Sequence, residues 1–250
     1  MAGQGRMSVL LAKIGVTACA IGAFLGVAAI GGYRLELLPL FPAIGIYAAS
    51  MVALATATPV ILVAMIGSRG RLGGWSLNAA GWIALVLCVG ITLNNLLWFR
   101  QVQVLPAIND VSTDLENPPA FKTERPPQAD PAGPSPPRYA AEAAAFRQRA
   151  AYPEIEPLFL EASVAEAVAR AERAATGLGW EVVARSPGEG RLEAVYTTPW
   201  FGLKGDVVVR VRPADRGVIV DVRSRSRIDM ADAGTNARRI RRLLAALRSQ

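Results

Sequence analysis

The fold is decided by the stretch Arg223-Ser224-Arg225-Ser226-Arg227, which continues through Asp232-Ala233-Gly234-Thr235-Asn236 to Arg239-Ile240. The alternating arginines predict a strand, because successive side chains of a strand point to opposite faces of a sheet. After a short loop, residues 235–248 have the spacing of an amphipathic helix that buries Ile240, Leu243, Leu244 and Leu247. A strand followed by such a helix predicts a sheet with a helix packed against it.

Three more strands are predicted at residues 180–185, 191–198 and 205–212, before the arginine strand at 217–227. The turns between them are short, which favours antiparallel hairpins. Alternation assigns one face to the core, with Val182, Ala184, Leu192, Ala194, Tyr196, Val207, Val209, Val211, Val218, Val220 and Val222. The opposite face is expected to be solvated and carries Glu181, Arg185, Arg191, Glu193, Arg210, Arg212, Asp221, Arg223, Arg225 and Arg227.

Two further helices and a short strand precede the hairpins. Ser163 and Glu166 form a capping box, which predicts the start of a helix that extends to about Gly177. High helix propensity predicts another helix at 139–149, and an apolar strand is expected at 158–160. Residues 138–250 are therefore predicted to form an α+β domain, in which two helices cover one face of a mainly antiparallel sheet.

The first hundred residues have a different composition, because three apolar spans occupy them at about 8–32, 41–66 and 77–99. Each is close to the ~20 residues that cross a hydrocarbon core of ~30 Å as a helix. A signal peptide is the alternative for the first span, but its apolar run is longer than a signal peptide has and two spans follow. Residues 1–100 are therefore predicted to be an α-helical membrane anchor of three transmembrane helices.

The net charge of +7 belongs mostly to this anchor. Residues 1–100 hold six basic residues and one acid, whereas residues 101–250 hold 21 and 19, so a nucleic-acid partner is not expected. Arg6, Lys13, Arg69 and Arg71 fall on one side of the three spans, and basic loops favour the cytoplasm. We expect a multi-pass membrane protein with a cytoplasmic N-terminus and an extracytoplasmic C-terminal domain.

The rarity of cysteine and histidine limits the possible chemistry. Cys19 and Cys88 both lie in predicted spans, and the chain contains no histidine. This composition excludes a thiol nucleophile in the domain, histidine-based triads and the usual zinc sites, so no cofactor or metal is expected.

A polar segment follows the spans and carries Asn109, Asp110, Thr113, Asp114 and Asn117. Such side chains compete for local backbone hydrogen bonds, so an extended loop is expected. Its oxygens are suited to a hard cation, but a turn-forming connector is favoured. A Pro-rich linker follows at 122–137, and residues 101–137 together are predicted to join the anchor to the domain.

The arginine strand has three interpretations. Arg223, Arg225 and Arg227 can pair with acids on a solvated face, or hold an anion such as a carboxylate or lipid phosphate. In the third interpretation, Asp110 and Asp114 fold back onto the arginines and clamp the polar segment to the domain. The aromatic pair Trp200 and Phe201 at a predicted hairpin tip is a separate candidate, for contact with the bilayer.

Three separated motifs resemble a bacterial and plastid family of domains of unknown function, numbered fourteen ninety-nine. They are Asn109-Asp110-Val111-Ser112-Thr113-Asp114 with Asn117-Pro118-Pro119, then Gly202-Leu203-Lys204-Gly205-Asp206, and the arginine strand with the helix start after it. The resemblance covers about 105–248 and implies no activity, but it implies that the polar motifs act together. The bacterial members of the family imply that the expected membrane is a bacterial inner (plasma) membrane, with the C-terminal domain periplasmic or otherwise extracytoplasmic. The candidate polar cluster is Asn109, Asp110, Thr113, Asp114, Asn117, Arg223, Arg225, Arg227, Asp232, Asn236 and Arg239.

The sequence thus predicts a membrane-anchored binding or envelope-structural module, whose partners are the lipid bilayer and an anionic ligand or lipid head group. A non-catalytic subunit of a larger membrane complex, held by a membrane-protein partner, is the first alternative. A carboxylate-based hydrolase is the second, since Asp110 and Asp114 are paired carboxylates.

Overall fold

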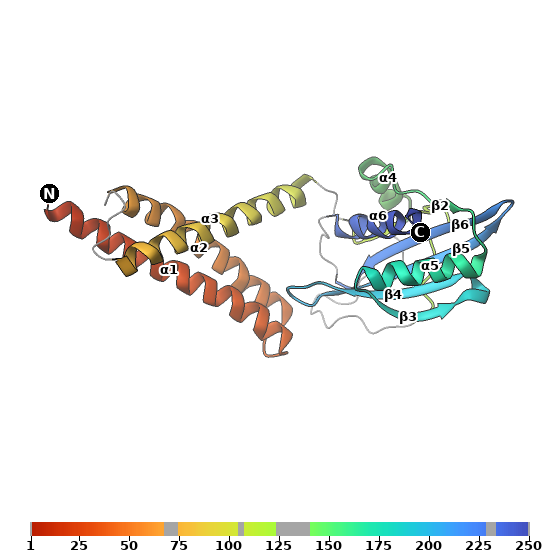
Figure 1. Cartoon of the computed structure of the whole chain (residues 1–250), viewed down its shortest axis with the longest axis horizontal. Helices are drawn as coiled ribbons and strands as arrows, with labels where there is room; N and C mark the ends of the chain where they lie inside the picture. The colour runs from red at the N-terminus through yellow and green to blue at the C-terminus, as the bar shows by residue number, and fades with distance from the viewer. Residues whose placement is uncertain (1, 68–74, 105–107, 124–140, 229–233, 250) are drawn as a thin grey trace. The chain divides into compact units, whose positions relative to one another are not determined.

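The structure of the protein is a computed structural model that describes residues 2–67, 75–104, 108–123, 141–228 and 234–249 (Figure 1). The chain divides into two compact units, Met1–Arg100 and Gln101–Gln250. Each has its own hydrophobic core, so each is described by itself.

The first unit contains the three predicted apolar helices. They are α1 (Ala2–Arg34), α2 (Leu40–Gly67) and α3 (Trp75–Val104), although α3 continues a few residues into the second unit. All three are long and apolar enough to cross a membrane, with candidate spans at Arg6–Arg34, Leu40–Gly67 and Asn78–Leu97. The prediction of three apolar N-terminal helices is therefore confirmed.

Small residues of α1 allow its backbone to approach α2 closely. Three glycines of α1, at 15, 22 and 26, face α2 residues 61, 54 and 50, so the two helices run antiparallel with matched spacing. An added Cβ would lie 2.5 Å from Ile61 Cγ1 at Gly15, 3.0 Å from Leu54 Cγ at Gly22 and 3.1 Å from Ser50 Oγ at Gly26. Close backbone approach of this kind is typical of helices packed in membranes.

The second unit is built on an antiparallel sheet (Figure 1). Its strands are β1 (Asp110–Ser112), β2 (Leu158–Leu160), β3 (Glu181–Ser186), β4 (Arg191–Thr197), β5 (Lys204–Ala214) and β6 (Gly217–Ser226). The order is β1-β6-β5-β4-β3, and β2 pairs with β6 beyond β1 on the same edge. The sheet is open, with β3 at the other edge.

Helices α5 (Val164–Gly177) and α6 (Thr235–Arg248) cover one face of this sheet, and α4 (Ala141–Ala151) precedes β2 (Figure 1). Ser163 caps α5 as predicted, because its side chain accepts a hydrogen bond from the Glu166 N–H. The valines at 207, 209, 211, 218, 220 and 222 enter the core beneath the helices. The predicted fold class, a helical membrane anchor plus an α+β domain, is confirmed.

The edge strand β3 departs from the predicted alternation at a β-bulge between Val182 and Ala184. Beyond the bulge, Ala184 lies opposite Glu193 and Arg185 lies opposite Leu192. Cross-strand partners share a face, so the predicted faces of Ala184 and Arg185 were wrong. Arg185 lies on the helix side, where its guanidinium pairs with Glu172 of α5 at 2.9 Å.

The face opposite the helices also differs from the prediction, because most of it is not solvated. Glu193 and Asp221 are fully buried, and Arg223 is 7% exposed. The covering segment is residues 113–123, here called the strap, which follows β1 and crosses β6, β5 and β4. The predicted extended loop thus begins as a strand of the sheet, and the sheet starts well before residue 138.

The glycine contacts between α1 and α2 in the first unit give the first prediction. Gly22→Leu should separate α1 from α2, because overpacking costs about 1–3 kcal/mol. We expect a lower melting temperature for the full chain in detergent. Gly31→Leu is the matched control, since a Cβ at Gly31 meets nothing within 4 Å. Equal melting of the two variants would contradict the packing.

Candidate functional site

The strap is held first by an ion pair between β1 and β6. Arg223 donates to both oxygens of Asp110, from Nε at 2.8 Å and from Nη2 at 2.6 Å. Its remaining terminal nitrogen donates to the Pro119 carbonyl oxygen at 3.1 Å. A bidentate pair of this kind fixes orientation as well as position. Arg223 therefore joins the start of the strap to its middle.

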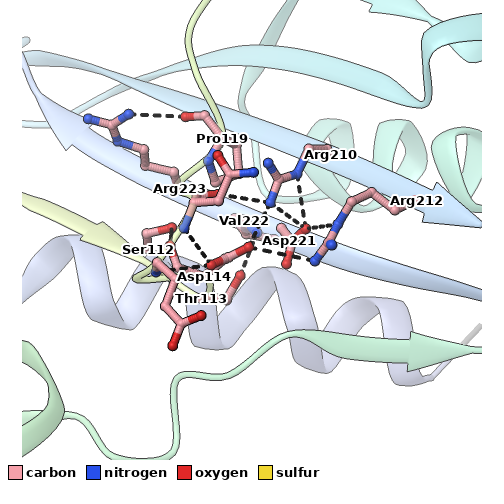
Figure 2. Close-up of polar contacts among 11 residues, drawn as sticks. Ser112, Thr113, Asp114, Pro119, Arg210, Arg212, Asp221, Val222 and Arg223 are labelled. Carbon is pink, nitrogen blue, oxygen red and sulfur yellow. Dashed lines mark hydrogen bonds and ion pairs between the residues drawn. The ribbon is translucent and has the colours of Figure 1, made fainter. Parts of the chain in front are cut away.

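A second group of charges lies further along β5 and β6 (Figure 2). Arg210 bridges Asp114 of the strap, at 2.8 Å, and Asp221 of β6, at 2.9 Å. Arg212 donates from Nε to the same Asp221 oxygen at 2.9 Å. The other Asp114 oxygen accepts the backbone N–H groups of residues 116 and 117, which shapes the strap's turn.

Glu193 of β4 anchors the far end of the strap. Its carboxylate accepts the backbone N–H of Lys122 at 2.7 Å and that of Thr123, and Arg191 donates to it at 2.6 Å. Burial alone would raise the pKa of Glu193, but these donors hold its pKa below the ordinary 4.5. The sequence marked Glu193 as outward-facing and gave no sign that a backbone segment would bind it.

Arg225 differs from the other arginines of this face. Asp110 and Asp206 flank it on the neighbouring strands, but Asp110 pairs with Arg223 and Asp206 pairs with Arg227 at 2.8 Å. Instead, Arg225 lies over the Phe121 ring, with its guanidinium carbon 4.8 Å from the centroid. The described residues supply no carboxylate to Arg225, which is partly exposed.

Asn236, the second residue of α6, lies on the other side of β6 and is fully buried. Its oxygen accepts from Ser224 Oγ at 2.7 Å, and its nitrogen donates to Ser226 Oγ and the Asn109 carbonyl oxygen, both at 3.0 Å. The serines between the arginines therefore face the helices, as alternation predicted. Asn236 ties the start of α6 to β6 and to the chain before β1.

Next to Asn236, three residues form a stack. The Arg239 guanidinium carbon lies 3.3 Å from the Tyr196 ring centroid, and the Tyr196 hydroxyl donates to Asn236. Beneath the ring is its cross-strand partner Gly205, where a Cβ would lie 2.0 Å from the hydroxyl oxygen. Gly205, the second glycine of the Gly202–Asp206 motif, thus leaves room for the tyrosine ring.

The candidate polar cluster is therefore divided between two faces of β6. Asp110, Asp114, Arg223, Arg225 and Arg227 are on the strap side. The residues Asn236 and Arg239 are on the helix side, whereas Asn109 and Asn117 contribute backbone carbonyls to Asn236 and Arg210. Asp232 lies outside the described residues.

Thr113 hydrogen-bonds to β6 between the part of β6 that pairs with β1 and the part that pairs with β2. Its hydroxyl accepts the Val222 N–H and its own N–H donates to the Val222 carbonyl, both at 2.9 Å. On the outer edge of β1, the buried Gln148 amide accepts from the Ser112 N–H at 3.1 Å and donates to the Ser112 carbonyl at 2.6 Å. Sequence reasoning missed Gln148, because nothing in its helical surroundings distinguishes it.

The geometry does not favour catalysis by Asp110 and Asp114, since each is bound to a different arginine. A cavity of about 360 Å³ opens between the strap, the end of α4 and the residues before β2, and Asp114 lines it but Asp110 does not. Among the described residues, no group of three or more acidic, cysteine or histidine side chains is arranged to hold a metal ion.

Comparison with models of protein families gives a match. The model of a family described as "Protein of unknown function (DUF1499)" matches residues 110–247, from the start of β1 almost to the end of α6. The matched range includes the strap as well as the sheet and helices that it contacts. No curated protein matches the chain.

The stack beneath α6 predicts that Gly205→Ala destabilises the domain by about 1–3 kcal/mol. The new methyl group has no space, because Arg239 and Asn236 hold the Tyr196 ring in place. Thermal unfolding of the full chain measures the loss. Gly188→Ala is the control, since nothing lies within 4 Å of its added Cβ. The stack is unimportant if both variants melt like wild type.

The lowered pKa of Glu193 makes stability depend on pH. Its ionised form stabilises the fold above the pKa of the unfolded chain, and this contribution is lost as pH falls through the lower folded-state pKa. Glu193→Gln should therefore melt earlier at neutral pH and change less than wild type between about pH 6 and about pH 3. The control is Glu161→Gln, at an exposed position. Parallel pH profiles for all three proteins would refute this role.

Proposed function

The chain belongs to the DUF1499 family of proteins of unknown function, and we propose that it is a membrane-anchored module that binds an anionic group through Arg225. In this proposal it is a multi-pass protein of the bacterial inner membrane, with its N-terminus in the cytoplasm and its domain outside. The basic residues on the N-terminal side of the spans support this orientation.

The observation that carries the proposal is the charge balance under the strap. Six arginines, at 191, 210, 212, 223, 225 and 227, share this network with five carboxylates, at 110, 114, 193, 206 and 221. Arg225 is the arginine for which the described part of the chain has no carboxylate. An unmatched guanidinium among fixed charges favours an incoming anion.

The surroundings of Arg225 suit a planar or tetrahedral oxyanion. Phe121 supports one face of the guanidinium and also lies under Arg223, at 5.3 Å. This stacking orders the side chain, which reduces the entropy lost when the fork binds a carboxylate or phosphate. Arg223 and Arg227 on either side are paired, so they contribute to local charge without competing for the ligand.

A purely structural module is the competing function. The strap supports it, because Asp110 and Asp114 clamp residues 113–123 onto the sheet by ion pairs. The two functions differ at Arg225, which does not belong to the described ion pairs. An essential anion site requires Arg225, whereas the clamp retains both of its ion pairs without it.

The test compares the full-length wild type with Arg225→Ala by native mass spectrometry from detergent, and by titration with inorganic phosphate. Wild type should bind phosphate, and Arg225→Ala should bind about ten- to a hundredfold more weakly, because a hydrogen bond to a charged group contributes about 1.5–3 kcal/mol. Arg216→Ala is the control, at an exposed arginine in the turn before β6.

Two results would contradict anion binding. In the first, Arg225→Ala and Arg216→Ala bind phosphate as wild type does. In the second, wild type carries no small anion after purification and does not bind phosphate. A protein that co-purifies in fixed ratio would instead favour a subunit of a larger membrane complex.

A further inference from the structure

We propose that the tip of the β4–β5 hairpin, residues 198–203, docks into the interfacial layer of the phospholipid bilayer through Trp200. The proposal concerns a surface of the domain, and it does not depend on anion binding at Arg225. It rests on the shape of the tip, on its place in the sheet and on the chemistry of the side chain that it presents.

The tip is a fixed turn with an exposed tryptophan. The Thr198 N–H donates to the Leu203 carbonyl at 2.8 Å, and the Leu203 N–H donates to the Thr198 hydroxyl at 2.8 Å. Gly202 completes the turn in the left-handed region, with φ of 66°. Trp200 nevertheless remains 71% exposed, so the turn presents the indole ring to its surroundings.

The tip lies at the end of the sheet where the chain enters the domain. At this end, the Ser226 N–H donates to the Asn109 carbonyl at 2.9 Å, and the Arg227 N–H donates to the Lys204 carbonyl at 3.2 Å. Asn109 and Lys204 are thus on either side of the same strand end, about 10 Å apart by the usual strand spacing. The hairpin tip continues directly from Lys204, the first residue of β5. The loop that joins β4 to β5 can be followed in Figure 1.

The covalent connection limits how far this end of the sheet can lie from the last residue of α3. Four peptide links join Val104, the last residue of α3, to Ile108. Consecutive Cα atoms are ~3.8 Å apart, so these links span at most ~15 Å. If α3 crosses a membrane, the end of the sheet that holds Asn109 and the tip is tethered near the bilayer surface. The opposite end, with the β5–β6 turn, has no such tether.

The tip has the chemistry of an interfacial anchor. Tryptophan prefers the boundary between lipid head groups and acyl chains, because its ring is apolar and its N–H needs a polar partner. Phe201 adds a second ring to the turn, and the exposed Lys204 follows at its base. A cationic side chain beside aromatic rings suits the phosphate level of the same layer. The bilayer is therefore the partner that this surface fits.

The experiment measures the depth of Trp200 in the full-length chain, with Trp75→Phe, Trp82→Phe, Trp98→Phe and Trp180→Phe. The protein is reconstituted in nanodiscs of phosphatidylcholine and phosphatidylglycerol, whose acyl chains are brominated close to the head group. We expect Trp200 emission to be blue-shifted from that of a tryptophan in water, and to be quenched as the fraction of brominated lipid increases.

The matched control moves the tryptophan to the far end of the sheet. Trp200→Phe with Phe159→Trp, in the same background, places it on β2, where Phe159 is 50% exposed and pairs with Ile219. The emission of this variant should not be quenched by brominated lipid. The proposal is overturned if Trp200 is unquenched, or if both variants are quenched alike.

A second readout avoids the tryptophan substitutions in case they impair folding. Phe201→Cys is combined with Cys19→Ser and Cys88→Ser, and the new thiol carries a fluorescent dye. Lipids with a nitroxide near the head group should quench the dye at residue 201, and should not quench the same dye introduced by Phe159→Cys. Absence of this difference would overturn the proposal independently of the tryptophan data.

Discussion

The Asp110–Arg223 ion pair is the interaction on which the arrangement of the sheet face opposite the helices depends. It fixes β1 against β6 and leads the strap across β5 to β4, where its backbone satisfies the buried carboxylate of Glu193. Without the strap, several charges in the middle of the sheet would keep their partners on neighbouring strands but lose their cover. A buried charge is tolerated only while its partners remain in place, so strap and sheet form one cooperative unit.

Periodicity in the sequence was enough to predict α6 and the four long strands, because burial on one side produces a regular pattern. The same alternation could not say what covers the other side. It marked Glu193 and Asp221 as outward-facing, yet both are buried by a segment distant in the chain. The β-bulge between Val182 and Ala184 was also not predicted. One inserted residue changes the face of every residue beyond it, so the predicted faces of Ala184 and Arg185 were wrong.

For the candidate site, alternation correctly predicted that the serines and the arginines of β6 face opposite sides of the sheet. It did not predict which other residues these side chains contact. Asp110 and Asn236 belong to different sequence motifs and lie on opposite faces of β6. Strand β1 was missed because three polar-flanked residues carry little pattern of their own. Its pairing comes from Thr113, Gln148 and the arginines of β6, which are tertiary contacts that local propensity does not contain.

Strand β6 has one more consequence, which concerns the order of events during synthesis. It pairs with β1, β2 and β5, and the Asp110–Arg223 contact joins residues 113 positions apart. All three of these partner strands emerge from the ribosome before β6 does. Contacts of such long range must wait for the closing segment, which makes folding slow and leaves apolar strands exposed in the meantime. The three helices can therefore reach the membrane while the domain that follows them is still unfolded.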